Sequence, residues 1–544
     1  MIFRSRRCNR CFLGWVLETA LLAITACAVL VPEGPDPLFA RPAARQVPQH
    51  SESSETAAGL HLERAGQAIK ADDLARGETE LRLALQADPN LAEAYFMLAG
   101  LELRKGNSVE AIQDFQRGLK LNPRSFQGHY NLALAYLHEG RRDEGLRELE
   151  QAARLNPGNA DVAYNLGVLM LGKGKPEEAL RRLRQAEAAQ PGRPDVAFNL
   201  ARALFALGRT QEANDQIARD SKRLSGDARW NASVGSLFLE HGNPGEALRY
   251  LGRSAELDPN NLTTREQLGA TYLSANQPED ALNALANDGS GQAHFLRASA
   301  LLKLRRLPLA GQESTRALDA EPDNPRYLLL AGRVAQYDRS QERALELIQK
   351  ALVAAPDWSE AYYSQAVSDY IERRYVDAQR SLDRALKLDP GSARSLFLYG
   401  IIQVNVGNNQ KAEEYLARAV ARDPANATFY FHLGTAFLRE NRTSEAQQAF
   451  EKAIQLRPAY ALPHYHLAKL FVKEGKNEPA EQEFLKAIDC QPDLAPAYYQ
   501  LSRLYGESAQ KEKAGQALAL FNRLKKEFNE EDLLLLEDAT LALR

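Results

Sequence analysis

The feature that most constrains this chain is a proline that returns every 34 residues over much of its length. Proline cannot continue a helix, because it lacks an N–H donor and clashes with the preceding turn, so each one predicts a helix end. Two regular series occur. The first is Pro89, Pro123, Pro157 and Pro191, and it continues at Pro259 after one period without proline. The second is Pro322, Pro356, Pro390, Pro424, Pro458 and Pro492. A fixed period of this length predicts stacked helical units that contact only their neighbours, so the chain needs no single large core.

Two further positions of the unit repeat with the proline. When each proline is set at repeat position 32, fourteen units begin near residues 58, 92, 126, 160, 194, 228, 262, 291, 325, 359, 393, 427, 461 and 495. Positions 8 and 20 then hold Ala, Gly or Ser in all fourteen units. Positions 4, 7, 8 and 11 share one face of a first helix, and positions 20, 24 and 27 share one face of a second. Small residues on both faces let the backbones approach, so each unit is predicted to be a packed helix pair.

The unit from Ala92 to Pro123 shows this pattern most clearly. It begins Ala92-Glu93-Ala94-Tyr95-Phe96-Met97-Leu98-Ala99 and continues with Gly106-Asn107, Ala111, Phe115, Gly118 and Pro123. It resembles a tetratricopeptide repeat (TPR), a helix–turn–helix unit of 34 residues. The resemblance covers about 470 of the 544 residues. It implies an all-α fold, a right-handed α-solenoid of about 14 TPR units.

The turn inside the unit also follows a rule. Position 15 is Gly in seven units, and Asn276 and Asn441 take its place in two others. Gly and Asn tolerate the left-handed conformation that ends many helices, so a left-handed residue is expected at this position.

The period is broken once, between Pro259 and Pro322. The spacing of these two prolines falls short of two full units, and the deletion falls near the loop-like sequence 287–291. Arg265 and Arg297 also occupy positions that are apolar in most other units. We therefore expect seven units in residues 58–290 and seven in residues 291–528. Residues 529–544 are expected to form a C-terminal capping helix, whose acidic start suits the positive end of a helix dipole.

The N-terminal segment 1–31 differs from the array. Four arginines precede a mostly apolar run over residues 12–31, which is the layout of a secretory signal and is long enough to span a bilayer. Three outcomes remain open: ordinary cleavage beside Cys27, lipidation of Cys27, or retention as a membrane anchor. Residues 32–57, rich in Pro and Ser, are predicted to be a disordered linker. The expected location is exported, periplasmic or membrane-anchored, facing outside the cytoplasm, with membrane contact through the N-terminal segment if it is uncleaved or lipidated.

The TPR resemblance implies a concave groove lined by the first helix of each unit. Repeat position 5 on this helix is aromatic in ten units. Two interpretations stay open, an aromatic ladder that binds an extended peptide or apolar helix, and aromatic packing within the array. The ten residues are Phe295 and the nine predicted groove aromatics, which are Phe96, Tyr130, Tyr164, Phe198, Tyr363, Phe397, Phe431, Tyr465 and Tyr499.

Polar residues complete the predicted groove. Asn131, Asn165 and Asn199 occupy repeat position 6 in successive units, where the resemblance implies hydrogen bonds to a ligand backbone, and Arg202 lies nearby. Near the C-terminus, Lys469 and Arg503 belong to a basic cluster with Lys473, His432 and His466. That cluster is either a site for an acidic peptide or an ordinary solvated face.

No catalytic motif, cofactor site or metal site is predicted. The sequence lacks a phosphate-binding Gly-rich loop, HExxH and GxSxG, and the CxxC of Cys8 and Cys11 has no second pair nearby. A net charge of −3 gives no basic field of the kind nucleic acid requires. The sequence therefore predicts a non-catalytic scaffold for a protein or peptide partner. The alternative is an accessory subunit of an envelope enzyme or of a polysaccharide-export, secretion or pilus-assembly machine.

Overall fold

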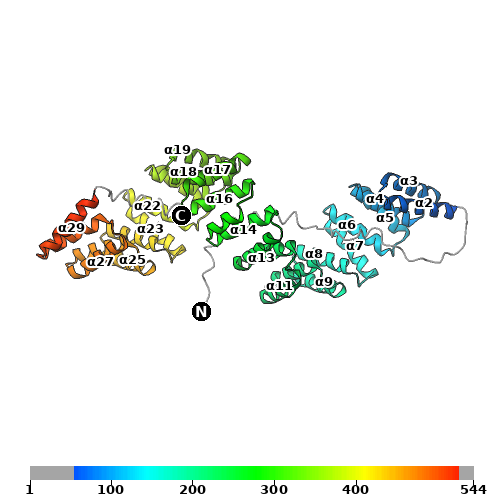
Figure 1. Ribbon diagram of the computed structural model, residues 1–544, viewed down its shortest axis with the longest axis horizontal. Coiled ribbons are helices and arrows are strands. Elements are labelled where there is room, and N and C mark those ends of the chain that lie inside the picture. Colours follow the sequence, from blue (N-terminus) through cyan, green and yellow to red (C-terminus); the bar gives the residue numbers. More distant parts are fainter. Residues whose placement is uncertain (1–53, 526–544) are drawn as a thin grey trace. The chain divides into compact units, whose positions relative to one another are not determined.

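The computed structural model describes residues 54–525, and this part of the chain is built from 28 α-helices with no strand (Figure 1). Even-numbered helices are the first helix of each unit and are called A helices; odd-numbered helices are called B helices. The A helices are α2 (Ser54–Lys70), α4 (Ala92–Arg104), α6 (Phe126–His138), α8 (Ala160–Gly172), α10 (Pro194–Ala206), α12 (Ala228–Glu240), α14 (Leu262–Ser274), α16 (Gly291–Lys303), α18 (Pro325–Tyr337), α20 (Ser359–Ile371), α22 (Ala393–Asn405), α24 (Ala427–Arg439), α26 (Ala461–Lys473) and α28 (Ala495–Glu507). The B helices are α3 (Leu74–Ala87), α5 (Ser108–Leu121), α7 (Arg142–Leu155), α9 (Pro176–Ala189), α11 (Thr210–Leu224), α13 (Pro244–Leu257), α15 (Pro278–Ala284), α17 (Leu307–Ala320), α19 (Gln341–Ala354), α21 (Tyr375–Leu388), α23 (Asn409–Arg422), α25 (Thr443–Leu456), α27 (Asn477–Cys490) and α29 (Lys511–Leu524).

The predicted fold class of paired helices is confirmed, and the predicted register holds along the array. From α4 to α28, every A helix begins at the residue where the proline register starts a unit. The first helix is the exception. It begins at Ser54, so the last four residues of the predicted 32–57 linker are helical. The rest of that linker, the N-terminal segment 1–31 with Cys27, and the predicted capping helix 529–544 lie outside the described residues.

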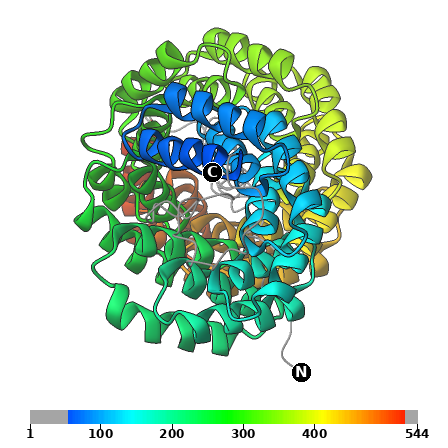
Figure 2. The same cartoon turned by 90° about the vertical axis from the view of Figure 1, so that its right-hand side faces the viewer.

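Helix packing divides the described chain into two compact units, residues 54–275 and residues 276–525. Inside each compact unit, an A helix packs on the B helix of the same repeat, and that B helix packs on the A helix of the next repeat. Figure 2 shows the order of the helices along the chain by their colours, from blue through green to red. The division falls between α14 and α15, the A and B helices of the seventh repeat.

Small residues at repeat positions 8 and 20 are buried where the two helices of a pair cross. A methyl group added at Gly167 would lie 2.6 Å from Leu183 Cγ, and one added at Gly400 would lie 2.6 Å from Leu416 Cγ. Ala111 and Ala179 at position 20 are fully buried. These approaches are shorter than carbon atoms tolerate, so the close packing inferred from the sequence is confirmed at these crossings.

Every unit has a left-handed residue at repeat position 15, between its A and B helices. The predicted Gly and Asn residues adopt this conformation, for example Gly407 at φ 82° and Asn441 at φ 61°. Five units place other residue types there, which are Asp72, Arg305, Arg339, Arg373 and Ala509, all with φ between 57° and 61°. The turn geometry is therefore imposed by the helix pair even where the residue does not favour it.

Replacing Arg339 with glycine is expected to stabilise the array by about 0.5–1 kcal/mol. A left-handed L-residue costs roughly 1–2 kcal/mol, while glycine costs about 0.5–1 kcal/mol in backbone entropy. A shift of the urea midpoint to higher concentration would show the gain. The reverse change, Gly407→Arg, is the matched control and should lower the midpoint. A lower midpoint for Arg339→Gly would contradict the argument.

The deletion in the sequence shortens one B helix. Helix α15 has seven residues, whereas the other B helices have 14 or 15. Arg297 of α16 extends into the space beyond its end, and its Nη1 donates to the carbonyl oxygens of Leu285 and Asp288, both at 2.7 Å. Its Nε donates to Glu313 Oε2 of α17 at 2.7 Å. The charged residue at a position that is apolar in most other units therefore caps the truncated helix end.

Glu313 is held ionised at this junction. Burial raises the pKa of its carboxyl, but the hydrogen bonds from His294 and Arg297 outweigh burial and leave the pKa below its ordinary value. The side chains of Arg297 and Glu313 are each 12% exposed, so their ion pair is largely desolvated. The junction depends on this pair.

Candidate functional site: the A-helix face

The surface formed by the outward-facing side chains of consecutive A helices is called the A-helix face. Neighbouring A helices touch directly within each compact unit, for example α8 with α10 and α20 with α22. Several of the side-chain hydrogen bonds between them span 35 residues, one repeat plus one position. The predicted groove residues all lie on A helices, so this face is where their geometry is tested.

Most of the predicted aromatic ladder is buried between units. The buried rings are Tyr130, Tyr363, Phe397, Phe431 and Tyr465, each at most 7% exposed. Phe96, Tyr164 and Phe198 are partly buried. Only Tyr499 of the last described A helix is exposed, at 40%, with its ring 5.1 Å from that of Phe521. The rings pack within the array, and a contact of these rings with a partner stays a prediction.

The predicted asparagines join the ring of the preceding unit. Asn165 Nδ2 donates to Tyr130 Oη at 3.4 Å, and Asn199 Nδ2 donates to Tyr164 Oη at 3.3 Å. Burial raises the pKa of both tyrosines to about 12, so both hydroxyls stay protonated at neutral pH. Two of the three predicted ligand-binding amides are thus used to link units.

Asn131 is the exception among these asparagines. The preceding unit offers Phe96, which has no hydroxyl, at the position of the tyrosines. Asn131 is 5% exposed, and its Oδ1 atom is buried without a hydrogen-bond partner. The sequence shows this difference. Asn165 and Asn199 each have a tyrosine 35 residues earlier, whereas Asn131 has Phe96 at that spacing.

Cations cover several of the ladder rings. Arg193 lies over Tyr164 with its guanidinium 5.1 Å from the ring centre, and it donates to both Asp161 and Asp195 at 2.6 Å. Arg202 donates to Asn199 Oδ1 at 3.1 Å and lies 5.8 Å from the centre of the Phe198 ring. The equivalent contacts in the second compact unit are Arg326 over Phe295 and Arg394 over Tyr363. This covering role of Arg193, Arg326 and Arg394 was not predicted, although Arg326 and Arg394 share one spacing from the rings they cover.

The predicted C-terminal basic cluster separates into two kinds of residue. Lys469, Lys473 and Arg503 are exposed on α26 and α28. His466 instead packs among the rings of Phe431, Phe450 and Tyr465, and burial lowers its pKa to about 3. His466 is therefore neutral at physiological pH and adds no charge to the cluster.

A histidine–glutamate pair that recurs in four repeats was not predicted from the sequence. Histidine at repeat position 4 lies against glutamate at position 23, which joins the A and B helices of one unit. The four pairs are His61–Glu80, His129–Glu148, His294–Glu313 and His464–Glu483, with Nδ1 to Oε2 distances of 2.5–2.8 Å. The constant sequence separation of histidine and glutamate in all four pairs is the signal that would have identified them.

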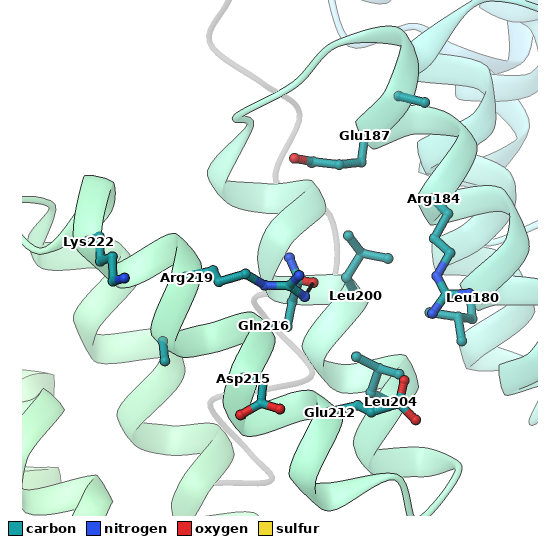
Figure 3. Close-up of a pocket in the computed structure, with 12 residues that line it drawn as sticks. Leu180, Arg184, Glu187, Leu200, Leu204, Glu212, Asp215, Gln216, Arg219 and Lys222 are labelled. Carbon is teal, nitrogen blue, oxygen red and sulfur yellow. Dashed lines mark hydrogen bonds between the residues drawn. The ribbon is translucent and has the colours of Figure 1, made fainter.

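One cavity of about 600 Å³ opens between α9 and α11 (Figure 3). Its apolar lining includes Leu180 of α9 and Leu200 and Leu204 of α10. Its charged lining consists of Arg184, Glu187, Glu212, Asp215, Arg219 and Lys222. Basic and acidic side chains are mixed around the leucines, so the cavity lining favours neither an anionic nor a cationic ligand.

Metal-binding and membrane-spanning features are absent from residues 54–525. In that part of the chain, no three His, Cys, Asp or Glu side chains are grouped so as to hold a metal ion. No helix there has the length and apolar character needed to cross a membrane.

Comparison with known proteins gives the same repeat. Two family models, each described as tetratricopeptide repeat, match the chain, one at residues 136–180, 170–237 and 437–505, and the other at residues 62–126, 363–427 and 400–461. Together these matches span more than half of the chain.

A curated relative and several solved structures are also similar. The chain is 28% identical over 141 residues to a DnaJ homolog subfamily C member 7 homolog from Dictyostelium discoideum, covering 24% of this chain and 26% of that protein. The chain thus spans about a quarter of the length of this relative. The crystal structure of the APC/C hetero-tetramer Cut9–Hcn1 contains a chain that is 14% identical, with a TM-score of 0.43, covering 82% of this chain and 96% of that one. A MamA structure is 20% identical with a TM-score of 0.30, covering 32% of this chain and 94% of that one.

Proposed function

Because the chain belongs to the tetratricopeptide repeat family, we propose that it is a non-catalytic scaffold that binds a protein or peptide partner on its A-helix face. Repeat position 9 carries this proposal. It lies next to the invariantly small position 8, yet it holds Val168, Arg202, Lys469 and Arg503 in different units. These side chains are partly or fully exposed. A partner lying along the face would meet a different position-9 side chain on α8, α10, α26 and α28, which is how a repeat array of uniform backbone acquires specificity.

Affinity capture tests this proposal with variants of the full chain in which one valine and one arginine are replaced by glutamate. Val168→Glu combined with Arg202→Glu changes the A-helix face, and Val109→Glu combined with Arg181→Glu makes the same chemical change on exposed positions of the B helices α5 and α9. A specific partner should be lost with the first variant and retained with the second. Circular dichroism shows whether both variants keep their helices. Equal retention by both variants would remove the A-helix face as the binding surface.

The captured proteins also distinguish the two functional classes. A stoichiometric envelope enzyme or pore subunit would favour an accessory subunit of an envelope enzyme, polysaccharide-export, secretion or pilus-assembly machine. Hydrolase or transferase activity of the purified chain would contradict the non-catalytic proposal.

We also propose that the array functions outside the cytoplasm. The support is the basic and then apolar sequence of residues 1–31, which resembles an export signal or an anchor. Cleavage, lipidation of Cys27 and retention in the membrane are all compatible with that sequence.

A further inference from the structure

Charge is distributed unequally between the A and B helices near the C-terminal end of the described chain. The A helices α22, α24, α26 and α28 carry five Arg or Lys side chains and one acidic side chain, Glu507. The B helices α23, α25, α27 and α29 carry eight basic and nine acidic side chains. These four A helices therefore carry a net positive charge, while the four B helices are nearly neutral.

The cations of this face have few anionic neighbours. Among the described residues, Lys469 and Lys473 form no ion pair; Lys469 instead lies 5.2 Å from the ring centre of Tyr465. Arg439 donates to the carbonyl oxygen of Val404 and to no carboxylate within the described chain. Arg503 has only a 3.9 Å contact with Glu507, and both side chains are about 60% exposed. On the B helices, acidic side chains lie among the cations, and within the described chain Arg418 pairs with Glu414 and Lys486 pairs with Glu483. The fifth cation of the A helices, Arg394 of α22, pairs with Glu360 and is not counted with these four.

The four cations follow a diagonal across three neighbouring helices. Arg439 and Lys473 share repeat position 13 on α24 and α26, while Lys469 and Arg503 share position 9 on α26 and α28. Positions 9 and 13 are one helical turn apart on the same side of a helix. Packed helices lie about 8–10 Å apart and one turn rises about 5.4 Å, so a path that takes one cation from each of the three helices has steps of roughly 10 Å, while Lys469 and Lys473 are about one turn apart on α26.

From this arrangement we propose that the face formed by α24, α26 and α28 binds an acidic peptide in an extended conformation. An extended chain advances about 3.3 Å per residue, so acidic side chains at every third residue would meet successive cations. This inference rests on the proposed function and names the chemistry of its partner. A peptide suits the face better than nucleic acid does, because the cations are few and the rings of Phe431 and Tyr465 are buried, which leaves Tyr499 as the one exposed ladder ring on α24, α26 and α28.

Fluorescence anisotropy with a defined peptide tests the proposal. The probe is a labelled peptide of four Glu-Ser-Ser triplets, which places Glu at every third position, and the control peptide has Gln at the same positions. The full chain should bind the Glu peptide at least tenfold more tightly than the Gln peptide. Its affinity should also fall several-fold between about 50 and 300 mM salt, because exposed charges are screened. Equal affinity for the two peptides would overturn the proposal.

Matched variants locate the binding surface. Lys469→Glu with Arg503→Glu reverses two cations of the face and should weaken binding of the Glu peptide at least tenfold. Lys411→Glu with Arg523→Glu makes the same charge change at exposed positions of the B helices α23 and α29 and should change the affinity less than twofold. Equal weakening by both variants would show a response to net charge alone and would overturn the site.

Two competing occupants are tested in the same assay. Residues 527–538 contain six acidic side chains, so a full-length variant with Gln or Asn at these six positions is included. Tighter peptide binding by this variant would assign the face to the chain's own C-terminal segment instead of a partner. Tighter binding of single-stranded DNA than of the Glu peptide would assign it to nucleic acid. If the α8 and α10 variant loses its captured partner while Lys469→Glu with Arg503→Glu leaves peptide binding unchanged, the scaffold function stands and only this inference fails.

Discussion

Replacing Arg297 with leucine is expected to unfold the junction around α15 locally, at a cost of about 3–5 kcal/mol. Leucine restores the apolar character that most other units have at this position, so a comparison of units alone predicts a neutral or stabilising change. The structure predicts the opposite, because Arg297 donates to the carbonyl oxygens of Leu285 and Asp288 and to the Glu313 carboxylate. Leucine would leave a largely buried carboxylate and two helix-end carbonyls without these donors.

Hydrogen exchange is the appropriate measurement, because it reports local opening of the helices around α15 separately from the rest of the array. Amides of residues 278–303 should exchange at least 100-fold faster in the variant, since a loss of about 1.4 kcal/mol in opening free energy already corresponds to a factor of ten. Amides of α24 to α28 should keep their wild-type rates. Lysine at position 297 keeps the charge but cannot reach three separate acceptors, so Arg297→Lys should recover only part of the protection.

Arg316→Leu is the matched control for this prediction. Arg316 also donates to Glu313, at 2.6 Å, but its side chain is 57% exposed. An exposed pair contributes about 1 kcal/mol or less, so exchange near α15 should change little. Similar exchange rates for Arg297→Leu and the wild type would show that the helix end needs no capping by this residue.

Much of the fold could be predicted from the sequence because its determinants are local and repeated. Proline ends helices wherever it occurs, and the small residue at position 8 is needed at every helix crossing, as the short distance from Gly400 to Leu416 shows. The role of Arg297 could not be predicted in the same way. It depends on where the carbonyl groups of a shortened helix lie, and no other unit repeats that geometry.

The candidate site was predictable by position but not by exposure. The sequence correctly places the aromatic residues of position 5 on A helices. Whether such a ring faces solvent depends on the next unit, where Arg193 covers Tyr164 and Asn165 binds the hydroxyl of Tyr130. Exposed positions such as 469 and 503 are therefore better candidates for partner contact than most of the ladder.

Replacing His466 with phenylalanine is expected to make the array less sensitive to acid. Burial, assisted by the nearby charges of Lys469 and His432, lowers the pKa of His466 from an ordinary value of 6.5 to about 3. Its Nδ1 atom is buried without a hydrogen-bond partner. The unfolded chain therefore takes up a proton below pH 6.5 that the folded chain does not. Folding is thus favoured fully above pH 6.5 and is progressively disfavoured as the pH falls from 6.5 towards 3.

The size of the effect at pH 5 follows from the same pKa difference. Between pH 6.5 and pH 5 the wild type should lose up to about 2 kcal/mol through His466, since each pKa unit corresponds to about 1.36 kcal/mol. Phenylalanine fits the cluster of aromatic rings and cannot be protonated. Urea midpoints at pH 7.5 and pH 5 should therefore show a stability difference between variant and wild type that grows as the pH falls. The exposed residue His138 gives the control, because the stability difference between His138→Phe and the wild type should be the same at pH 7.5 and pH 5. If the stability difference between His466→Phe and the wild type is also the same at both pH values, the folded chain accepts a proton at His466, which requires an open aromatic cluster between α24 and α26.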